Sequence, residues 1–219
     1  MFHTIKEDIK TIYENDPAAK STVEIIFCYP GFQALVLHRV AHKLLRWKVP
    51  FFPRFISYLA RFLTGVDIHP AAQIGARCFI DHGTGVVIGE TSVVGKDVLI
   101  YQQVTLGGTG CQHGKRHPTI GDGVVLGAGS KVLGNITVGA NTRIGAGSVV
   151  VGNVPSNCTV VGVPGRVVRQ KVLGRNGVLM HNKIPDPVKT ELKMLHREMM
   201  LLQEKIKELS GGAETPAEK

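Results

Sequence analysis

Aliphatic residues recur at every sixth position through the middle of the 219-residue chain. The series runs from Ile68 to Val86, resumes at Ile88 after a shift of two residues, and continues after a longer gap from Ile120 to Val150. Its members are Ile68, Ile74, Ile80, Val86, Ile88, Val94, Ile100, Leu106, Ile120, Leu126, Val132, Val138, Ile144 and Val150. A period of six is neither the 3.6-residue period of an α-helix nor the two-residue period of an alternating strand. The pattern therefore predicts a repeat architecture.

A six-residue period is typical of a parallel β-helix built from hexapeptide repeats. Each hexapeptide forms one short strand and a corner, and three of them, about 18 residues, close one triangular coil. The aliphatic residue points into the coil. The small or β-branched residue four positions later fits beneath the corner, as predicted for Ala72, Thr84 and Ser130. Residues 66–106 and 120–155 therefore predict roughly four coils or a little more.

A helical pattern precedes the repeats. Residues 1–64 are predicted to be helical, and within 31–47 the apolar residues recur at the helical period, at Phe32, Leu35, Val36, Val40, Leu44 and Leu45. Asp16 and Pro17 have the order of a helix N-cap followed by proline at the first helical position. Ser21 and Glu24 have the spacing of a capping box.

Two features of this helical part invite a functional interpretation. His38 and His42 lie one helical turn apart, as the histidines of a zinc-protease helix do, but Arg39 stands where the catalytic glutamate would follow. We therefore interpret both histidines as ordinary helix residues. The apolar and basic segment 51–65 is compatible with a helix on a membrane surface, but we expect it to pack against the rest of the protein.

A third pattern occupies the end of the chain. Apolar residues alternate spacings of four and three at Val188, Leu192, Leu195, Met199, Leu202, Ile206 and Leu209. This heptad pattern predicts a helix over 187–209 that forms a short coiled coil, ended by Gly211 and Gly212. Packing of the helix on its own domain is the alternative.

The chain is therefore predicted to be an α+β protein in three parts. An N-terminal helical domain spans 1–64, and a β-helix domain spans 65–170 with a loop at 107–119. A C-terminal extension spans 171–219 and consists of helix 187–209 and a disordered tail.

Composition narrows the function classes. Lysine and arginine number 26 against 17 aspartates and glutamates, so the net charge is +9. A basic chain suits nucleic acids, anionic membranes or small polyanionic substrates. Because the sequence has no zinc-finger spacing, no RNP motif and no run of five basic residues, we expect no nucleic-acid partner and favour a phosphate-bearing small molecule. The four cysteines form no C-x-x-C pair, which argues against a zinc site or a disulfide framework.

Targeting signals are also absent from the sequence. The N-terminus lacks the apolar region of a signal peptide. No window reaches the 18 apolar residues that span a bilayer. We therefore expect a cytoplasmic protein with no membrane partner.

The polar residues that interrupt the repeats are the candidates for chemistry. Asp81 and His82 are adjacent in the glycine-rich stretch IDHGTGVVIGE, residues 80–90. The segment 107–119, GGTGCQHGKRHPT, is too polar for the coil interior and is predicted to leave it as a loop, where binding residues tend to collect. Histidine, with an ordinary pKa of about 6.5, suits a general base at neutral pH.

Four segments in this order closely resemble bacterial serine O-acetyltransferases: GVDIHPAAQIG, DHGTGVVIGETSVVG, VTLGGTG and GKRHPTIGDGVVLGAGSKVLGNITVGANTRIGAGSVV. The resemblance spans residues 16–166. It implies that the β-helix is left-handed. It also implies transfer of an acetyl group from acetyl-CoA to the hydroxyl of L-serine, giving O-acetyl-L-serine and CoA in cysteine biosynthesis. Acetyl-CoA is then a co-substrate, and no permanently bound cofactor is implied.

The resemblance also implies residue roles. His82 is the general base, and Asp67 orients it. Asp16, Asp81, Arg116 and His117 bind serine, and Gly108, Ala128 and Ala146 lie along CoA. The residue types suit these roles, because arginine grips a carboxylate through two hydrogen bonds, and an aspartate on the far ring nitrogen fixes a histidine tautomer.

Three alternative functions stay open on this sequence. The first is an acetyltransferase for another hydroxyl acceptor, such as a sugar or another amino acid. The second is a zinc carbonic anhydrase on the same repeat, with His82, His113 and His117 as ligands. The third is a non-catalytic scaffold, in which each candidate has a structural role: Asp16 as a helix cap, Asp67 as a turn residue, His82 as a corner histidine bonded to backbone, and Arg116 in a solvated loop.

The assembly is predicted from the ends of the chain. Only 15 residues precede Asp16, so we expect a homotrimer joined by a parallel coiled coil of its C-terminal helices, with a hexamer as the alternative. Many members of the resembling family end in an isoleucine that inserts into O-acetylserine sulfhydrylase. This chain ends in Glu218 and Lys219, so we do not expect that complex.

Overall fold

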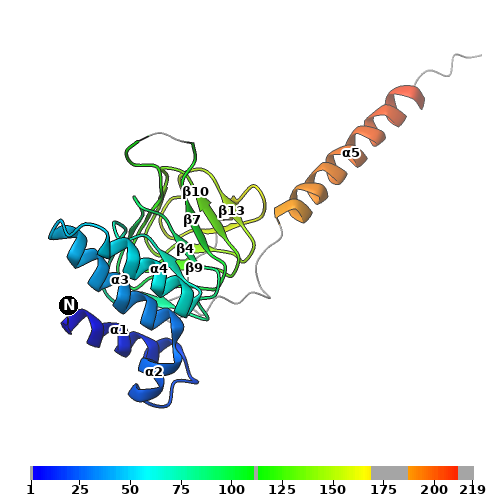
Figure 1. The fold of residues 1–219 in the computed structure, drawn as a ribbon. Coiled ribbons are helices and arrows are strands. Elements are labelled where there is room, and N and C mark those ends of the chain that lie inside the picture. The colour runs from blue at the N-terminus through cyan, green and yellow to red at the C-terminus, as the bar shows by residue number, and fades with distance from the viewer. Residues whose placement is uncertain (1, 111–112, 169–186, 212–219) are drawn as a thin grey trace, which may run out of the picture. The chain divides into compact units, whose positions relative to one another are not determined.

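A computed structural model describes residues 2–110, 113–168 and 187–211 of the chain (Figure 1). They belong to two compact units, Met1–Ile184 and Pro185–Lys219. The first unit opens with the helices α1 (Phe2–Asn15), α2 (Thr22–Cys28), α3 (Pro30–Arg46) and α4 (Phe52–Thr64). Of the helices in the described ranges, none combines the length and apolarity that crossing a membrane requires.

Short strands follow the helices and form three sheets. Sheet A contains β1 (Asp67–Ile68), β4 (Val87–Ile88), β7 (Thr105–Gly107), β10 (Lys131–Leu133) and β13 (Val149–Val150). Sheet B contains β2 (Gln73–Ile74), β5 (Val93–Val94), β8 (Thr119–Ile120) and β11 (Thr137–Val138). Sheet C contains β3 (Phe79–Ile80), β6 (Leu99–Ile100), β9 (Val125–Leu126), β12 (Arg143–Ile144), β14 (Thr159–Val161) and β15 (Arg166–Val168). From β1 to β13 every third strand returns to the same sheet, β14 and β15 extend sheet C, and all pairings are parallel except that of β14 with β15.

This architecture confirms the predicted α+β fold, in which helices precede a left-handed parallel β-helix and a further helix follows it. The predicted aliphatic series fills the coil. In sheet A the stacked residues are Ile68, Ile88, Leu106, Val132 and Val150. All five are buried, and full burial of such a side chain contributes about 1.5–3 kcal/mol to folding. The coil continues beyond the predicted end, because β13, the bridge of Val154 to Val138 and β14 form a fifth turn.

The corner after β3 differs from the prediction. Val86 does not serve as the strand anchor; it is fully buried beneath the corner, and Ile88 pairs with Ile68 in its place. Thr84, predicted to lie beneath the corner, is exposed. The two extra residues expand this corner outward, and its backbone has positive φ at His82 (60°) and Gly83 (64°). The shift in the six-residue period therefore marks the corner that carries the candidate base.

The helix start predicted at Asp16 is wrong. Residues 16–21 are not helical, and Asp16 Oδ1 accepts a hydrogen bond from the backbone N–H of Ala18 (2.8 Å) in a turn. Helix α2 begins at Thr22 instead. Ser21 is its N-cap, and the Ser21 Oγ accepts from the Glu24 N–H (3.1 Å), as the capping-box spacing predicts. Asp16 is thereby left free of a helix-capping role.

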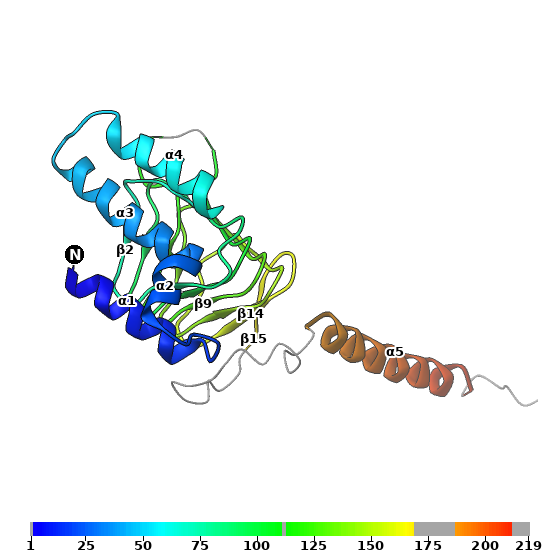
Figure 2. The same cartoon turned by 60° about the horizontal axis from the view of Figure 1, so that its bottom comes forward.

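Helices α3 and α4 lie side by side in both views (Figures 1 and 2) and cover the start of the coil. Helix α4 packs inward through small residues, namely Pro53, Ser57, Ala60 and Thr64. Its large side chains face outward: Phe52, Phe55, Tyr58, Leu59, Phe62 and Leu63 are all exposed, as is Phe51 directly before the helix. The prediction that 51–65 packs against the rest of the protein therefore holds only for the small-residue face of the helix.

Burial of His38 predicts an acid-sensitive fold. The His38 Nε2–H donates to the Ala72 carbonyl (3.1 Å), and burial, with His42 and Arg39 nearby, lowers the pKa of His38 to about 3. Below pH 6.5 His38 is protonated in the unfolded chain, whereas in the folded chain it stays neutral until about pH 3. The free energy of unfolding therefore falls as the pH falls through this window. Between pH 7 and 5 the free energy of unfolding should drop by about 2 kcal/mol through this group.

Urea unfolding at both pH values tests this prediction. In His38→Gln the difference in unfolding free energy between pH 7 and 5 should shrink by that amount, whatever the absolute stability of the variant. An unchanged difference would contradict the assignment of the acid sensitivity to His38.

The second unit contains α5 (Pro187–Gly211), which confirms the predicted helix and extends it by two residues. Its heptad side chains from Leu192 to Leu209 are exposed in the single chain. The predicted tail after Gly212 lies outside the described residues.

Candidate active site

The candidate residues lie on two edges of the triangular coil. The first edge, called the C/A edge, is where sheet C passes into sheet A, at corner residues 81–86, 101–104, 127–130 and 145–148. The second, called the A/B edge, is where sheet A passes into sheet B, at 69–72, 89–92 and 108–118. The C/A edge carries Asp81, His82, Ala128 and Ala146, whereas the A/B edge carries Gly108, Arg116 and His117. Sheet A lies between the two edges.

His82 stands out from the C/A edge. Its side chain is 71% exposed, and its Nε2 lies 3.7 Å from Asp81 Oδ1. The positive φ at His82 places it in the expanded corner, so the imidazole faces solvent rather than the aliphatic core. A histidine in this position is accessible to a substrate and has a carboxylate beside it.

Asp16 lies near this corner, close enough for its carboxylate to repel the charge of Asp81. Burial raises the pKa of Asp81, the His82 charge lowers it, and the Asp16 carboxylate raises it further. The Tyr29 hydroxyl donates to Asp16 Oδ2 (2.7 Å), and burial together with this bond raises the pKa of Tyr29. Within the described residues neither carboxylate pairs with lysine or arginine. Two carboxylates without a cation suit an ammonium group.

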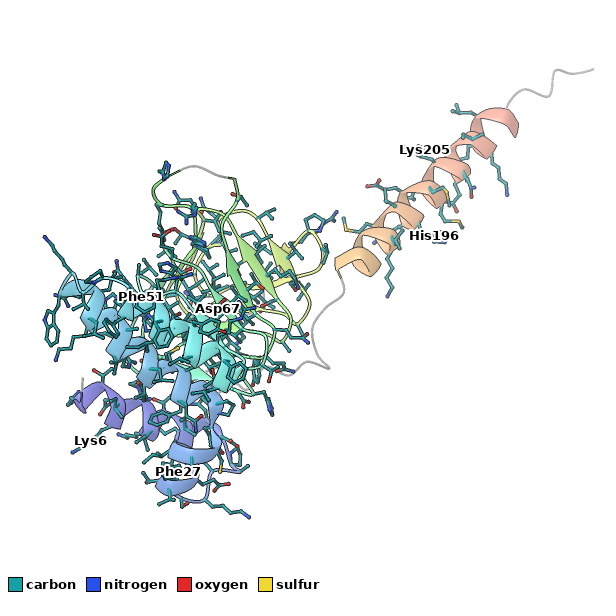
Figure 3. All side chains as sticks on the ribbon, in the orientation of Figure 1. Lys6, Phe27, Phe51, Asp67, His196 and Lys205 are labelled. Carbon is teal, nitrogen blue, oxygen red and sulfur yellow. The ribbon has the colours of Figure 1, made fainter. Side chains whose placement is uncertain are left out.

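Asp67 lies on β1 in sheet A and faces α4 (Figure 3). Its Oδ2 lies 3.4 Å from Nη1 of Arg61, and both side chains are at least one-third exposed. The structure thus shows Asp67 paired with arginine, whereas the carboxylate beside His82 is that of Asp81.

Arg116 and His117 are held at the A/B edge by residues after β4. Arg116 Nη2 donates to Glu90 Oε2 (2.5 Å), and this bond lowers the pKa of Glu90. The His117 side chain lies directly on Gly89, where an added Cβ would come within 2.0 Å of the imidazole. Burial lowers the pKa of His117, and the Arg116 charge lowers it further. The imidazole is therefore neutral and fixed in place.

Gly108 completes the A/B group. A Cβ at Gly108 would lie 3.2 Å from both Arg116 Cγ and His117 Nε2, so a side chain here would press on both residues. The segment that carries them leaves the coil between β7 and β8 (Figure 1), as predicted.

Three contacts in these groups escaped the sequence analysis: those of Tyr29, Glu90 and Thr91. Thr91 holds Arg116 and His117 by hydrogen bonds between positions 25 and 26 residues apart. Their positions were the only indication in the sequence. Glu90 and Thr91 directly follow the DHGTGVVIG stretch, and Tyr29 directly precedes a proline that begins a helix. Contacts across a long loop leave no periodic signal.

The chain does not bring the two groups together. Within the described residues no hydrogen bond or ion pair joins the C/A group of Asp16, Asp81 and His82 to the A/B group of Arg116 and His117. A single chain therefore has two groups of candidate residues, called half-sites below, on either side of sheet A.

Known proteins are similar to this chain in sequence and in fold. The family model "Bacterial transferase hexapeptide (six repeats)" matches residues 117–152. The serine acetyltransferase of Synechococcus elongatus is 55% identical over 210 residues, which cover 96% of this chain and 86% of that protein. The solved structure of Neisseria gonorrhoeae serine acetyltransferase in complex with serine is 45% identical, with a TM-score of 0.73 over 75% of this chain and 68% of that one. A serine acetyltransferase in complex with cysteine is 42% identical, with a TM-score of 0.77 over 79% of this chain and 67% of that one.

Proposed function

The chain belongs to the serine acetyltransferase family, and from this premise we propose that it transfers an acetyl group from acetyl-CoA to the hydroxyl of L-serine with His82 as the general base. The observation that carries the residue assignment is the division of charge between the half-sites. Two carboxylates, neither paired with a lysine or arginine of the described residues, lie at the corner that carries an exposed histidine, and an arginine lies on the opposite edge. A serine zwitterion has the matching ammonium and carboxylate groups.

Serine binding follows from these charges. Asp16 and Asp81 accept the ammonium group, and Arg116 and His117 donate to the carboxylate. The Glu90 carboxylate already occupies one side of Arg116, so it holds the guanidinium in place while the remaining N–H groups stay available. An acceptor lacking both charged groups, such as a sugar, would leave these residues unpaired.

The reaction then needs only one proton transfer to begin. His82 accepts the proton of the serine hydroxyl as its oxygen attacks the thioester carbonyl carbon of acetyl-CoA. The tetrahedral intermediate collapses, the C–S bond breaks, and CoA leaves as the thiolate, which takes up the proton from the imidazolium. No covalent enzyme intermediate forms. Asp67 supports the imidazolium in this proposal, which requires it to exchange its contact with Arg61 for one with His82.

In this proposal acetyl-CoA lies along Gly108, Ala128 and Ala146. Ala128 and Ala146 stand in successive coils, where the Gly147 N–H donates to the Ala128 carbonyl (2.8 Å), so their small side chains form a strip along the C/A edge. Gly108 belongs to the other edge. The co-substrate, like serine, therefore needs both half-sites.

A homotrimer brings the half-sites together. In a threefold ring with sheet A turned toward the axis, the C/A edge of one copy meets the A/B edge of the next, because both edges flank the same sheet. Helix α4 packs on β1 of that sheet, and its exposed aromatic side chains then face the neighbouring copy rather than water. The heptad face of α5 gives the trimer a second contact. We also propose a cytoplasmic location. The proposed domains are the helical domain 1–64, the β-helix domain 65–170 and the C-terminal extension 171–219.

Sedimentation tests the trimer. We expect the wild-type chain of 23.7 kDa to sediment at three times that mass. Replacing Phe62 and Leu63 with serine removes two of the most exposed apolar side chains of α4 and should shift the protein toward monomer. Phe27→Ser, which alters an equally exposed residue on α2, serves as the control and should leave the mass unchanged. A wild-type monomer or a stable hexamer would contradict the trimer.

A further inference from the structure

The Thr91 hydroxyl is at the centre of the A/B half-site. Its Oγ1 lies 3.0 Å from the backbone N–H groups of both Arg116 and His117, and it accepts a hydrogen bond from each. Both lone pairs of the hydroxyl are then in use. Oγ1 also lies 2.9 Å from Nδ1 of His117, so in this third contact the hydroxyl is the donor.

A second donor converges on the same ring nitrogen. The backbone N–H of Thr91 points at Nδ1 of His117 (3.2 Å). A nitrogen that accepts from two donors carries no proton of its own, so the proton of the neutral imidazole is on Nε2. The lowered pKa of His117 agrees with this arrangement, because burial and the Arg116 charge disfavour a second proton on the ring.

We propose that Thr91 is a positioning residue that holds His117 in the Nε2–H tautomer, so that His117 donates a hydrogen bond to the serine carboxylate beside Arg116. The inference rests on the proposed function for the identity of the substrate. Nε2 has no hydrogen-bond partner among the residues that the structure describes, and the Gly89 and Gly108 backbones fix the ring on either side. In the opposite tautomer, the Nε2 lone pair would face the carboxylate and repel it.

The variants Thr91→Val and Thr91→Ser distinguish the effect of the Thr91 hydroxyl from the effect of the side chain's shape. Valine keeps the volume but removes the hydroxyl. We expect kcat/KM for serine to fall about 10- to 100-fold in Thr91→Val, chiefly through KM, because the ring loses its donor and two N–H groups lose their acceptor. KM for acetyl-CoA should stay within a factor of about two, and Thr91→Ser should stay close to wild type. Thr137→Val, on the outer face of sheet B, controls for the loss of a surface hydroxyl.

The tautomer itself is measurable without activity. In protein labelled with ¹⁵N-histidine, the long-range proton–nitrogen correlation pattern of His117, identified by its absence in His117→Asn, should show Nε2–H in the wild type at pH 7.5. In Thr91→Val the pattern should move toward a mixture of tautomers. A proton on Nδ1 in the wild type overturns the inference, and so does unchanged serine kinetics in a folded Thr91→Val.

The two proposals fail in distinguishable ways. If the wild type releases no CoA with serine, the proposed function fails and the tautomer measurement still decides the role of Thr91. If the wild type acetylates serine but its His117 carries the proton on Nδ1, the function stands and the positioning role of Thr91 is wrong. Should Thr91→Val not fold, the wild-type spectrum and Thr91→Ser decide.

Discussion

His82→Ala is expected to lower kcat for CoA release from acetyl-CoA and L-serine by about 10²–10⁴-fold. The serine hydroxyl is a poor nucleophile until a base accepts its proton, and His82 is the exposed imidazole of the C/A half-site, 3.7 Å from Asp81. Because the side chain is 71% exposed, its removal should leave the fold intact. Circular dichroism and the melting temperature verify this. Initial rates, followed through the thiol of released CoA, measure the loss.

His113→Ala is the matched control. His113 is exposed in the segment between β7 and β8 and has no assigned role in acetyl transfer, so its removal should leave kcat within a factor of about two. The same variant tests the carbonic anhydrase alternative, which needs His113 as a zinc ligand. Carbon dioxide hydration that disappears in His113→Ala, with no acetyl transfer in the wild type, would contradict the proposed function. Acetylation of another alcohol but not of serine would retain the base and change the substrate.

Two impaired variants, each altered in a different half-site, should complement each other. His82→Ala disables the C/A half-site, and Arg116→Ala disables the A/B half-site by about 10- to 100-fold through loss of the carboxylate contact. If each active site of a trimer joins the edges of two neighbouring copies, each trimer that contains both variants has one of its three sites with both halves intact. We therefore expect about a third of the wild-type rate from the isolated mixed trimers.

The mixed protein must be isolated by two different tags, one on each variant, so that only mixed assemblies are assayed. Co-expression of two tagged copies of His82→Ala is the control and should show no recovery. No recovery in the mixed protein, with wild-type activity present, would place both half-sites of each active site within one chain. That result would contradict the trimer proposed here while leaving the roles of His82 and Arg116 in place.

The coil is predictable from the sequence because the requirement for a buried aliphatic residue repeats every six residues. Each aliphatic anchor, such as Ile100 or Ile144, must be buried in the same way at each corner, so the period is visible without any contact being known. The C-terminal helix was predictable for the same reason, from its heptad spacing. The two-residue shift near Val86 was visible as an interruption, but only the structure shows that it expands the corner outward at His82.

The tertiary structure decided everything that depends on distant residues meeting. The local pattern at Asp16 predicts a helix cap, but the structure places Asp16 in a turn, where it accepts a hydrogen bond from Tyr29 and lies near Asp81. The outward direction of the α4 aromatics depends on which face of the helix meets α3 and β1, and a helical period alone does not fix that choice.

In the candidate site, too, the sequence indicates the residues and only the fold shows how they are placed. The resemblance in sequence named His82, Asp81, Arg116 and His117, but not which of them lie together. Closing the coil separates them onto two edges, and closing the loop after β7 brings Thr91 under the His117 ring. Residue types and periods are local properties, and a sequence displays them directly. Hydrogen bonds such as those of Thr91 arise only when the backbone between the partners has taken its final path, so only the tertiary structure determines them.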